Sequence, residues 1–357
     1  MSDFVFIQDR SYAVEAFKSA LCEEGYSVDV IPLSHIYKWS LPNILEIYNI
    51  IKNSFIITSA VFVSPSILAL LNKIKLVSNG YVIRMCGDPL IELRTRGFFK
   101  YNIETITVNF GLKNASAIFY VAKYLQKIYE QKFPNLNHKT IYNGIDMNIF
   151  SPKMGDKQLF DYYITKKSNE NNELNAVCVM NFNIELKMRY LPIFAKILQK
   201  IERKYDINFF FIGGGVYFTK CQLIFKDCKN VYFLGKLSRR TLSRILPLFD
   251  FFFYPTSLDV LPNVLLEASA SGLACLSTYV GGIPEIVIHE KTGLLSISSD
   301  NFYNYLKILI EDSNLRKTFG RAARKWMEKN FSENIVGQHF VKELFSSLNT
   351  KGSLNLY

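Results

Sequence analysis

Short apolar runs alternate with amphipathic helical stretches along almost the whole chain of 357 residues. This alternation is typical of βαβ units, in which crossover helices join parallel strands. Strand-like runs lie at 4–7, 27–33, 55–63, 81–85, 117–121 and 139–143, and again at 176–182, 207–215, 230–235, 250–256, 273–280 and 293–297. The pattern predicts an α/β protein with doubly wound parallel sheets, which bind ligands at the carboxyl ends of their strands.

A polar, charged stretch separates the two series of strands. The chain is long for one ordinary core, so two domains are expected. We predict a first domain over 1–150, a linker over 151–173 and a second domain over 174–333. A helical segment follows at 334–357.

The net charge of +11 is compatible with an ordinary basic surface, an anionic small substrate or an anionic membrane surface. Neither a long Lys/Arg run nor a known nucleic-acid motif occurs, so nucleic acid is disfavoured as a partner. Residues 53–72 carry no charge, but Pro65 and several Ser and Thr within them favour a buried strand and helix over a membrane span.

The six cysteines occur singly, without any CxxC pair. This pattern argues against a disulfide scaffold and a zinc cage, and it indicates a reducing compartment. The four histidines form no cluster with cysteines or acids, so no metal site is predicted. Because the N-terminus also lacks the pattern of a secretory signal, we predict a cytoplasmic protein and leave peripheral membrane contact open.

The segment TSLDVLPNVLLEASASGLACL (256–276) carries two acids around a predicted helix. Pro262 suits the first helical turn and Gly272 suits the stop, which places Asp259 on the entering loop and Glu267 inside the helix. The free amides of residues 261–264 would form a seat for phosphate. Since both acids would repel phosphate, they are better suited to sugar hydroxyls. An unremarkable loop acid and a solvated helix acid are the alternative from spacing alone.

Three glycines follow the apolar run at 207–212. Gly213, Gly214 and Gly215 allow a tight turn or a close approach of the backbone to a ligand. Phe218 stands where a dinucleotide fingerprint has its last glycine, so a nicotinamide enzyme is disfavoured.

The D-x7-E arrangement resembles the E-x7-E motif of retaining GT-B glycosyltransferases, glycosyltransferase family 4. Further similar segments are YNGIDMNIFSPK (142–153), FIGGG (211–215), NVYFLGKLS (230–238), GGIPEIVIHEKTGLL (281–295) and FGRAARKWMEKNFS (319–332). The resemblance implies two Rossmann-like domains that face each other across a cleft, with the acceptor side in the first domain and the nucleotide sugar in the second. It also implies that the C-terminal helix packs back on the first domain.

In function, the resemblance implies a glycosyltransferase, expected to be a hexosyltransferase, that retains the anomeric configuration without a metal or other cofactor. Its substrates would be a UDP- or GDP-linked sugar and an acceptor glycan, glycolipid or protein. Glu267 would hold the ribose, Asp259 the donor sugar, and Lys187 the diphosphate leaving group. The expected donor contacts also include Gly213, Gly214, Lys236, Leu237, Val260, Leu261, Pro262 and Asn263.

Several positions depart from the family pattern. The first acid is Asp259, one methylene shorter than Glu, and Val260 replaces a usual glycine. Phe182 replaces an arginine, for which Arg189 or Arg84 are candidate substitutes, and Asp88 is a candidate acceptor-side group. These departures motivate one alternative, a catalytically silent nucleotide- or sugar-binding protein of the same fold. Another GT-B-like enzyme that acts on a sugar phosphate is a further alternative.

Overall fold

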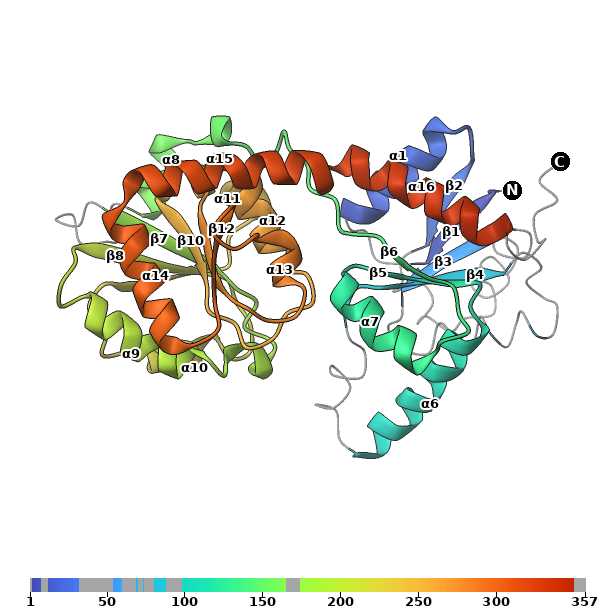
Figure 1. The fold of residues 1–357 in the computed structure, drawn as a ribbon, viewed down its shortest axis with the longest axis horizontal. Coiled ribbons are helices and arrows are strands. Elements are labelled where there is room, and N and C mark those ends of the chain that lie inside the picture. Colours follow the sequence, from blue (N-terminus) through green and yellow to red (C-terminus); the bar gives the residue numbers. More distant parts are fainter. Residues whose placement is uncertain are drawn as a thin grey trace. The chain divides into compact units, whose positions relative to one another are not determined.

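The computed structural model describes residues 2–7, 12–31, 54–59, 80–87, 98–164 and 174–349, together with Ala69 and Lys73. The chain divides into two compact units (Figure 1). Unit 1 comprises Met1–Gly144 and Glu333–Tyr357, and unit 2 comprises Ile145–Ser332. Each unit contains a six-stranded sheet of parallel strands, so the predicted α/β class is confirmed.

The sheet of unit 1 has the strand order β2-β1-β3-β4-β5-β6. Its strands are β1 (Phe4–Ile7), β2 (Val28–Ile31), β3 (Phe55–Ser59), β4 (Tyr81–Met85), β5 (Ala117–Tyr120) and β6 (His138–Thr140). The described helices of this unit are α1 (Tyr12–Glu23), α6 (Phe98–Asn114), α7 (Lys123–Lys132) and α16 (Glu333–Asn349). The strands β1, β4 and β5 are buried along their whole length, which explains why they are continuous apolar runs.

The C-terminal helix α16 packs within unit 1. Its buried residues Val336, Phe340, Leu344 and Leu348 recur every four positions and so share one face. Phe340 stacks on Phe17 of α1 with ring centroids 4.1 Å apart. This apolar face ties the end of the chain to its first helix.

The sheet of unit 2 has the order β12-β11-β10-β7-β8-β9. Its strands are β7 (Leu174–Val179), β8 (Ile207–Ile212), β9 (Val231–Gly235), β10 (Phe251–Tyr254), β11 (Cys275–Thr278) and β12 (Gly293–Ser296). The helices are α8 (Lys157–Tyr163), α9 (Leu191–Ile201), α10 (Phe218–Ile224), α11 (Arg239–Ile245), α12 (Asn263–Ala270), α13 (Ile283–Ile286), α14 (Ser299–Glu311) and α15 (Ser313–Asn330), with 3-10 turns η2 (Pro152–Met154), η4 (Glu185–Met188) and η5 (Leu246–Leu248). In Figure 1, α9, α10 and α14 lie on one side of this sheet and α11 and α12 on the other.

The region predicted as a linker differs from the structure. Residues 145–150 belong to unit 2, and the helix α8 lies inside the predicted linker 151–173. Asp156 caps α8 by accepting a hydrogen bond from the Leu159 amide, and Phe160 packs edge-on against Phe249 at 5.0 Å. Only Phe160 and Ile164 of residues 157–164 are buried, and the other residues of this stretch are at least partly exposed. Two buried residues are too few to mark a helix in the sequence pattern.

Candidate functional site

The strand order of unit 2 brings two distant loops together. β7 and β10 are neighbours, although β8 and β9 lie between them in the sequence. The chain therefore leaves the two strands in opposite directions, which makes the carboxyl ends of β7 and β10 a topological switch point. The loop after β7 leads into η4, which carries Lys187, and the loop after β10 carries Asp259.

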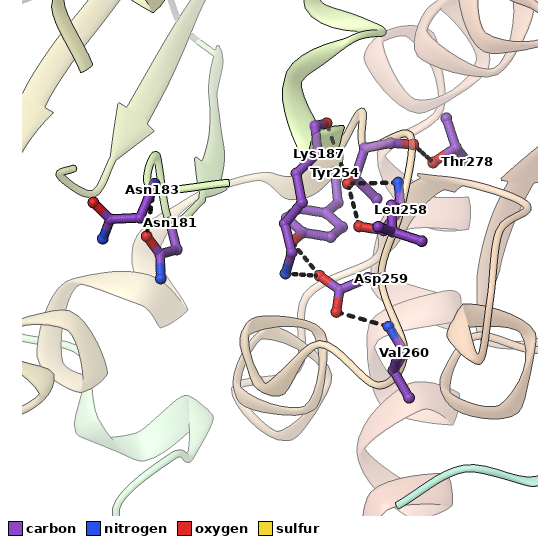
Figure 2. A network of polar contacts seen from close by, with 9 residues as sticks. Asn181, Asn183, Lys187, Tyr254, Leu258, Asp259, Val260 and Thr278 are labelled. Carbon is purple, nitrogen blue, oxygen red and sulfur yellow. Dashed lines mark hydrogen bonds and ion pairs between the residues drawn. The ribbon is translucent and has the colours of Figure 1, made fainter. Parts of the chain in front are cut away.

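Lys187 and Asp259 form an ion pair across this switch point (Figure 2). The Lys187 Nζ lies 2.6 Å from Asp259 Oδ2, and the side chains are only 17% and 10% exposed. The Tyr254 hydroxyl donates to the same oxygen at 2.8 Å, and the Val260 amide donates to Oδ1 at 2.9 Å. Both carboxylate oxygens of Asp259 are thus hydrogen-bonded.

Hydrogen bonds to main-chain carbonyls hold the loop after β10 in place, and one of them joins it to Lys187. The Ser257 amide donates to the Lys187 carbonyl at 3.1 Å, and the Thr256 hydroxyl donates to the Leu258 carbonyl at 3.0 Å. The Thr278 hydroxyl in turn donates to the Thr256 carbonyl at 2.5 Å. The position of the ion pair is therefore set by main-chain bonds as well as by its charges.

Tyr254 stays protonated next to this pair. Its side chain ends β10 and is buried, and burial raises its pKa well above the ordinary value. The negative charge of Asp259 acts in the same direction, because it disfavours a second anion nearby. The Tyr254 hydroxyl is consequently a hydrogen-bond donor to Asp259 throughout the physiological pH range.

The helix α12 has the form that the sequence predicts, with its first residue one position later. Pro262 is the N-cap, and the helix runs from Asn263 to Ala270. Gly272 follows with φ +81°, while the Leu273 amide donates to the Ala268 carbonyl at 3.1 Å. This is a Schellman ending, and it requires a residue that tolerates the left-handed region.

Glu267 lies one turn inside α12 and is buried. The Nε of Arg239, at the start of α11, lies 3.3 Å from its Oε1. The Arg239 guanidinium also lies over the Phe150 ring, 4.6 Å from the centroid. Burial raises the pKa of Glu267, and the charge and hydrogen bond of Arg239 oppose this shift. The carboxylate is therefore a desolvated acceptor with one cationic partner.

The glycine turn after β8 packs against the loop after β7. Gly213 has φ +144°, and a Cβ there would lie 1.9 Å from the Met180 carbonyl oxygen. The Phe182 amide donates to the Gly214 carbonyl at 3.1 Å. The Phe182 side chain, at the family's arginine position, is buried and contacts the Phe218 ring edge-on at 5.6 Å.

The remaining predicted site residues have different surroundings. Lys236, Asn263 and Arg189 are exposed, Leu237 is half-buried and Leu261 is buried. Arg84 is buried in β4 of unit 1, where it donates to Cys86 Sγ at 2.8 Å and to Asn143 Oδ1 at 2.5 Å. Asp88 lies outside the described residues. The functional roles of all these residues stay predictions.

The sequence analysis missed two residues whose side chains bind the two predicted acids in the structure. Tyr254 bonds to Asp259, and Arg239 pairs with Glu267. The first had a signal, since a tyrosine that ends an otherwise apolar buried strand needs a hydrogen-bond partner. Arg239 had none, because Arg240 follows it and periodicity does not tell which of the two turns inward.

Within the described parts of the chain, no group of three or more His, Cys, Asp or Glu side chains is arranged to hold a metal ion. No described helix has both the length and the apolar character needed to cross a membrane. All six cysteines are free thiols.

Most of unit 2 is similar to a known sequence family. Residues 166–326 match the profile of the family described as glycosyl transferases group 1. N-acetyl-alpha-D-glucosaminyl L-malate synthase of Bacillus anthracis is 27% identical over 240 residues, which are 65% of this chain and 60% of that protein. A GDP-mannose-dependent alpha-(1-6)-phosphatidylinositol monomannoside mannosyltransferase of Mycobacterium tuberculosis is 32% identical over 143 residues, which are 36% of this chain and 37% of that protein. The chain thus spans less than two thirds of both relatives.

Solved structures match over nearly the whole chain. Sucrose-phosphate synthase from Thermosynechococcus elongatus has a TM-score of 0.74 at 13% identity, with 98% of this chain and 100% of that chain covered. Anabaena Alr3699/HepE in complex with UDP-glucose has a TM-score of 0.71 at 16% identity, with 96% and 99% covered. The GT-B fold implied by the sequence motifs is confirmed. The chain therefore has the GT-B fold, and its residues 166–326 are similar to the family of glycosyl transferases group 1.

Proposed function

We propose that this protein is a glycosyltransferase that moves a sugar, expected to be a hexose, from a UDP- or GDP-linked donor to an acceptor hydroxyl. The observation that carries the proposal is the Lys187–Asp259 ion pair at the switch point of unit 2. A cation and a hydroxyl-binding acid are both needed where a sugar leaves a diphosphate. The family adds retention of the anomeric configuration and independence of metals to the proposal.

The chemistry assigns a task to each group. The bond between the anomeric carbon and the diphosphate oxygen breaks, the acceptor oxygen bonds to the anomeric carbon, and the proton of the acceptor hydroxyl passes to the leaving diphosphate. Negative charge then builds on the leaving diphosphate, and Lys187 stabilises it. Asp259 accepts hydrogen bonds from donor sugar hydroxyls, and Glu267 accepts those of the ribose, since a buried carboxylate is a strong acceptor.

The names of the relatives support the proposed donor and acceptor classes. One neighbour is described with UDP-glucose, and one relative is named as GDP-mannose-dependent. Two relatives are named as an N-acetyl-alpha-D-glucosaminyl L-malate synthase and as a phosphatidylinositol monomannoside mannosyltransferase. The names of these relatives thus include both a small hydroxy acid and a glycolipid. We propose a glycan, glycolipid or protein acceptor. Six free thiols support a cytoplasmic location.

A donor panel tests this proposal directly. With UDP-, GDP- and ADP-sugars, in EDTA and without acceptor, we expect slow release of nucleoside diphosphate from one donor. Glu267→Ala should weaken binding of that donor about 10- to 100-fold, because hydrogen bonds to a charged acceptor are lost. No release from any donor, together with measurable nucleotide binding, would favour the catalytically silent alternative, which the buried Phe182 at the arginine position motivates.

Nucleotide affinity should also depend on pH through Glu267. Its raised pKa means that a protonated fraction appears at higher pH than for an ordinary carboxyl group. Protonation makes the carboxyl group a poorer acceptor for ribose hydroxyls, so affinity should fall as the pH is lowered through the raised pKa of Glu267. Titration calorimetry with the nucleoside diphosphate measures this. Glu267→Gln should remove this acid-side dependence, and an unchanged dependence in that variant would assign it to another group.

A further inference from the structure

The carboxylate of Asp259 has three hydrogen-bond donors of different stiffness. Lys187 Nζ and the Tyr254 hydroxyl share Oδ2, at 2.6 Å and 2.8 Å, and the Val260 amide donates to Oδ1. A lysine ammonium sits on a flexible four-carbon stem, so it follows its counter-charge more than it fixes it. A buried tyrosine has two side-chain torsions and a rigid ring.

The ring of Tyr254 is fixed by its position in the sheet. It is the last residue of β10 and is 2% exposed. Its ring stacks with that of Phe252 at a centroid distance of 6.3 Å, and its carbonyl accepts a hydrogen bond from the Ser277 hydroxyl at 2.9 Å. The hydroxyl therefore projects from a packed strand end towards the loop that carries Asp259.

We propose that Tyr254 is a positioning residue of the sugar-transfer site, which fixes the Asp259 carboxylate while Lys187 binds the diphosphate. The inference rests on the proposed function. In the free protein Lys187 neutralises Asp259. When the diphosphate of a donor attracts the Lys187 ammonium, Asp259 retains its bonds to Tyr254 and to the Val260 amide. The carboxylate then keeps its orientation towards the sugar hydroxyls and is not left as a buried charge without a donor.

The short side chain of Asp259 makes this support more important. An aspartate reaches one methylene less far than the glutamate of the family motif, so a small rotation moves its oxygens away from a sugar hydroxyl. Catalytic geometry tolerates little such displacement. A rigid donor on Oδ2 restricts that rotation.

Tyr254→Phe tests the inference, because it removes one oxygen and keeps the packed ring. We expect donor turnover to fall about 10-fold, the cost of losing one hydrogen bond to a charged group. Affinity for the nucleoside diphosphate alone should change less than about twofold, because that ligand has no donor sugar for Asp259 to orient. This affinity also shows that the site of the variant is folded.

Tyr81→Phe is the matched control. Tyr81 is likewise a buried tyrosine at 0% exposure, and its hydroxyl donates to the Gly111 carbonyl at 2.7 Å in unit 1. Loss of the Tyr81 hydroxyl should lower the melting temperature about as much as Tyr254→Phe does, and it should leave donor turnover unchanged. Equal turnover in Tyr254→Phe and Tyr81→Phe would refute the positioning role.

A double variant tells whether Tyr254 acts through Asp259. In an Asp259→Ala background, Tyr254→Phe should cause no further loss of turnover, whereas independent roles would give additive losses. Additive losses would overturn the inference. Absence of turnover in the wild-type protein with every donor would instead contradict the proposed function itself, and the role of Tyr254 with it.

Discussion

Replacing Lys187 by Met is expected to lower donor turnover by about 10²- to 10³-fold, the usual cost of losing one group that stabilises a transition-state charge. Met keeps most of the length of the side chain and removes the ammonium group, with its charge and its hydrogen bond to Asp259. The leaving nucleoside diphosphate then develops its negative charge without the ammonium that lies at the switch point of unit 2. The ratio of kcat values for donor hydrolysis, measured at saturating donor, gives the effect.

The stability of the Lys187 variant should fall less than its activity. Asp259 loses its cation but keeps its hydrogen bonds to the Tyr254 hydroxyl and to the Val260 amide. A buried ion pair that is broken from one side leaves an uncompensated charge, and these two donors offset part of that cost. In thermal unfolding, the variant should therefore have a lower melting temperature than the wild type and still be folded at the temperature of the assay.

Lys220→Met is the matched control for Lys187→Met. Lys220 also pairs at 2.6 Å with an acid, Glu185, which belongs to η4 like Lys187, but both side chains are more than half exposed. An exposed pair contributes at most about 1 kcal/mol, so turnover and melting temperature should stay close to those of the wild type. Equal turnover in the two methionine variants would remove Lys187 from the leaving-group role.

The parts of the fold that depend on local signals were predictable from the sequence. Pro262 and Gly272 mark the limits of α12, and the structure places the helix between them with Glu267 one turn inside. The alternating apolar runs likewise predicted parallel sheets, because buried parallel strands have no polar face to interrupt them. These features arise within about 20 residues of chain.

The pairing of side chains at the site was not predictable from spacing. Lys187 and Asp259 are 72 positions apart, and they meet only because β7 and β10 are adjacent in the sheet. The resemblance to a family supplied separate roles for them but no contact. The bonds from Tyr254 and Arg239 to the two acids depend on the same tertiary order. Helix α8, inside the predicted linker, is a local element that was also not predicted, because its few buried apolar residues are too weak a sequence signal.

Gly213→Ala is expected to destabilise unit 2 by about 3 kcal/mol or more, a size that marks strain in the backbone together with a steric clash. The residue has φ +144°, a conformation that side chains rarely adopt, and its Cβ would lie 1.9 Å from the Met180 carbonyl oxygen. The opposing loop has little freedom to yield. The Met180 amide donates to the Ile212 carbonyl at 2.9 Å, and the Gly213 amide donates to the Gly235 carbonyl at 2.9 Å. Urea unfolding followed by circular dichroism measures the loss.

Gly214→Ala is the control for Gly213→Ala, because it shows whether any added side chain in this turn destabilises the protein. A Cβ at Gly214 meets only the Lys236 Cβ, at 3.4 Å, and the residue has no positive φ. Its unfolding free energy should stay within about 1 kcal/mol of the wild type, since the added methyl makes an ordinary van der Waals contact. Equal stability of the two alanine variants would mean that the loop after β7 can move away from the added methyl group. That loop leads to Lys187. The position of the Lys187–Asp259 ion pair would then depend on the main-chain hydrogen bonds of Lys187 and not on the glycine turn.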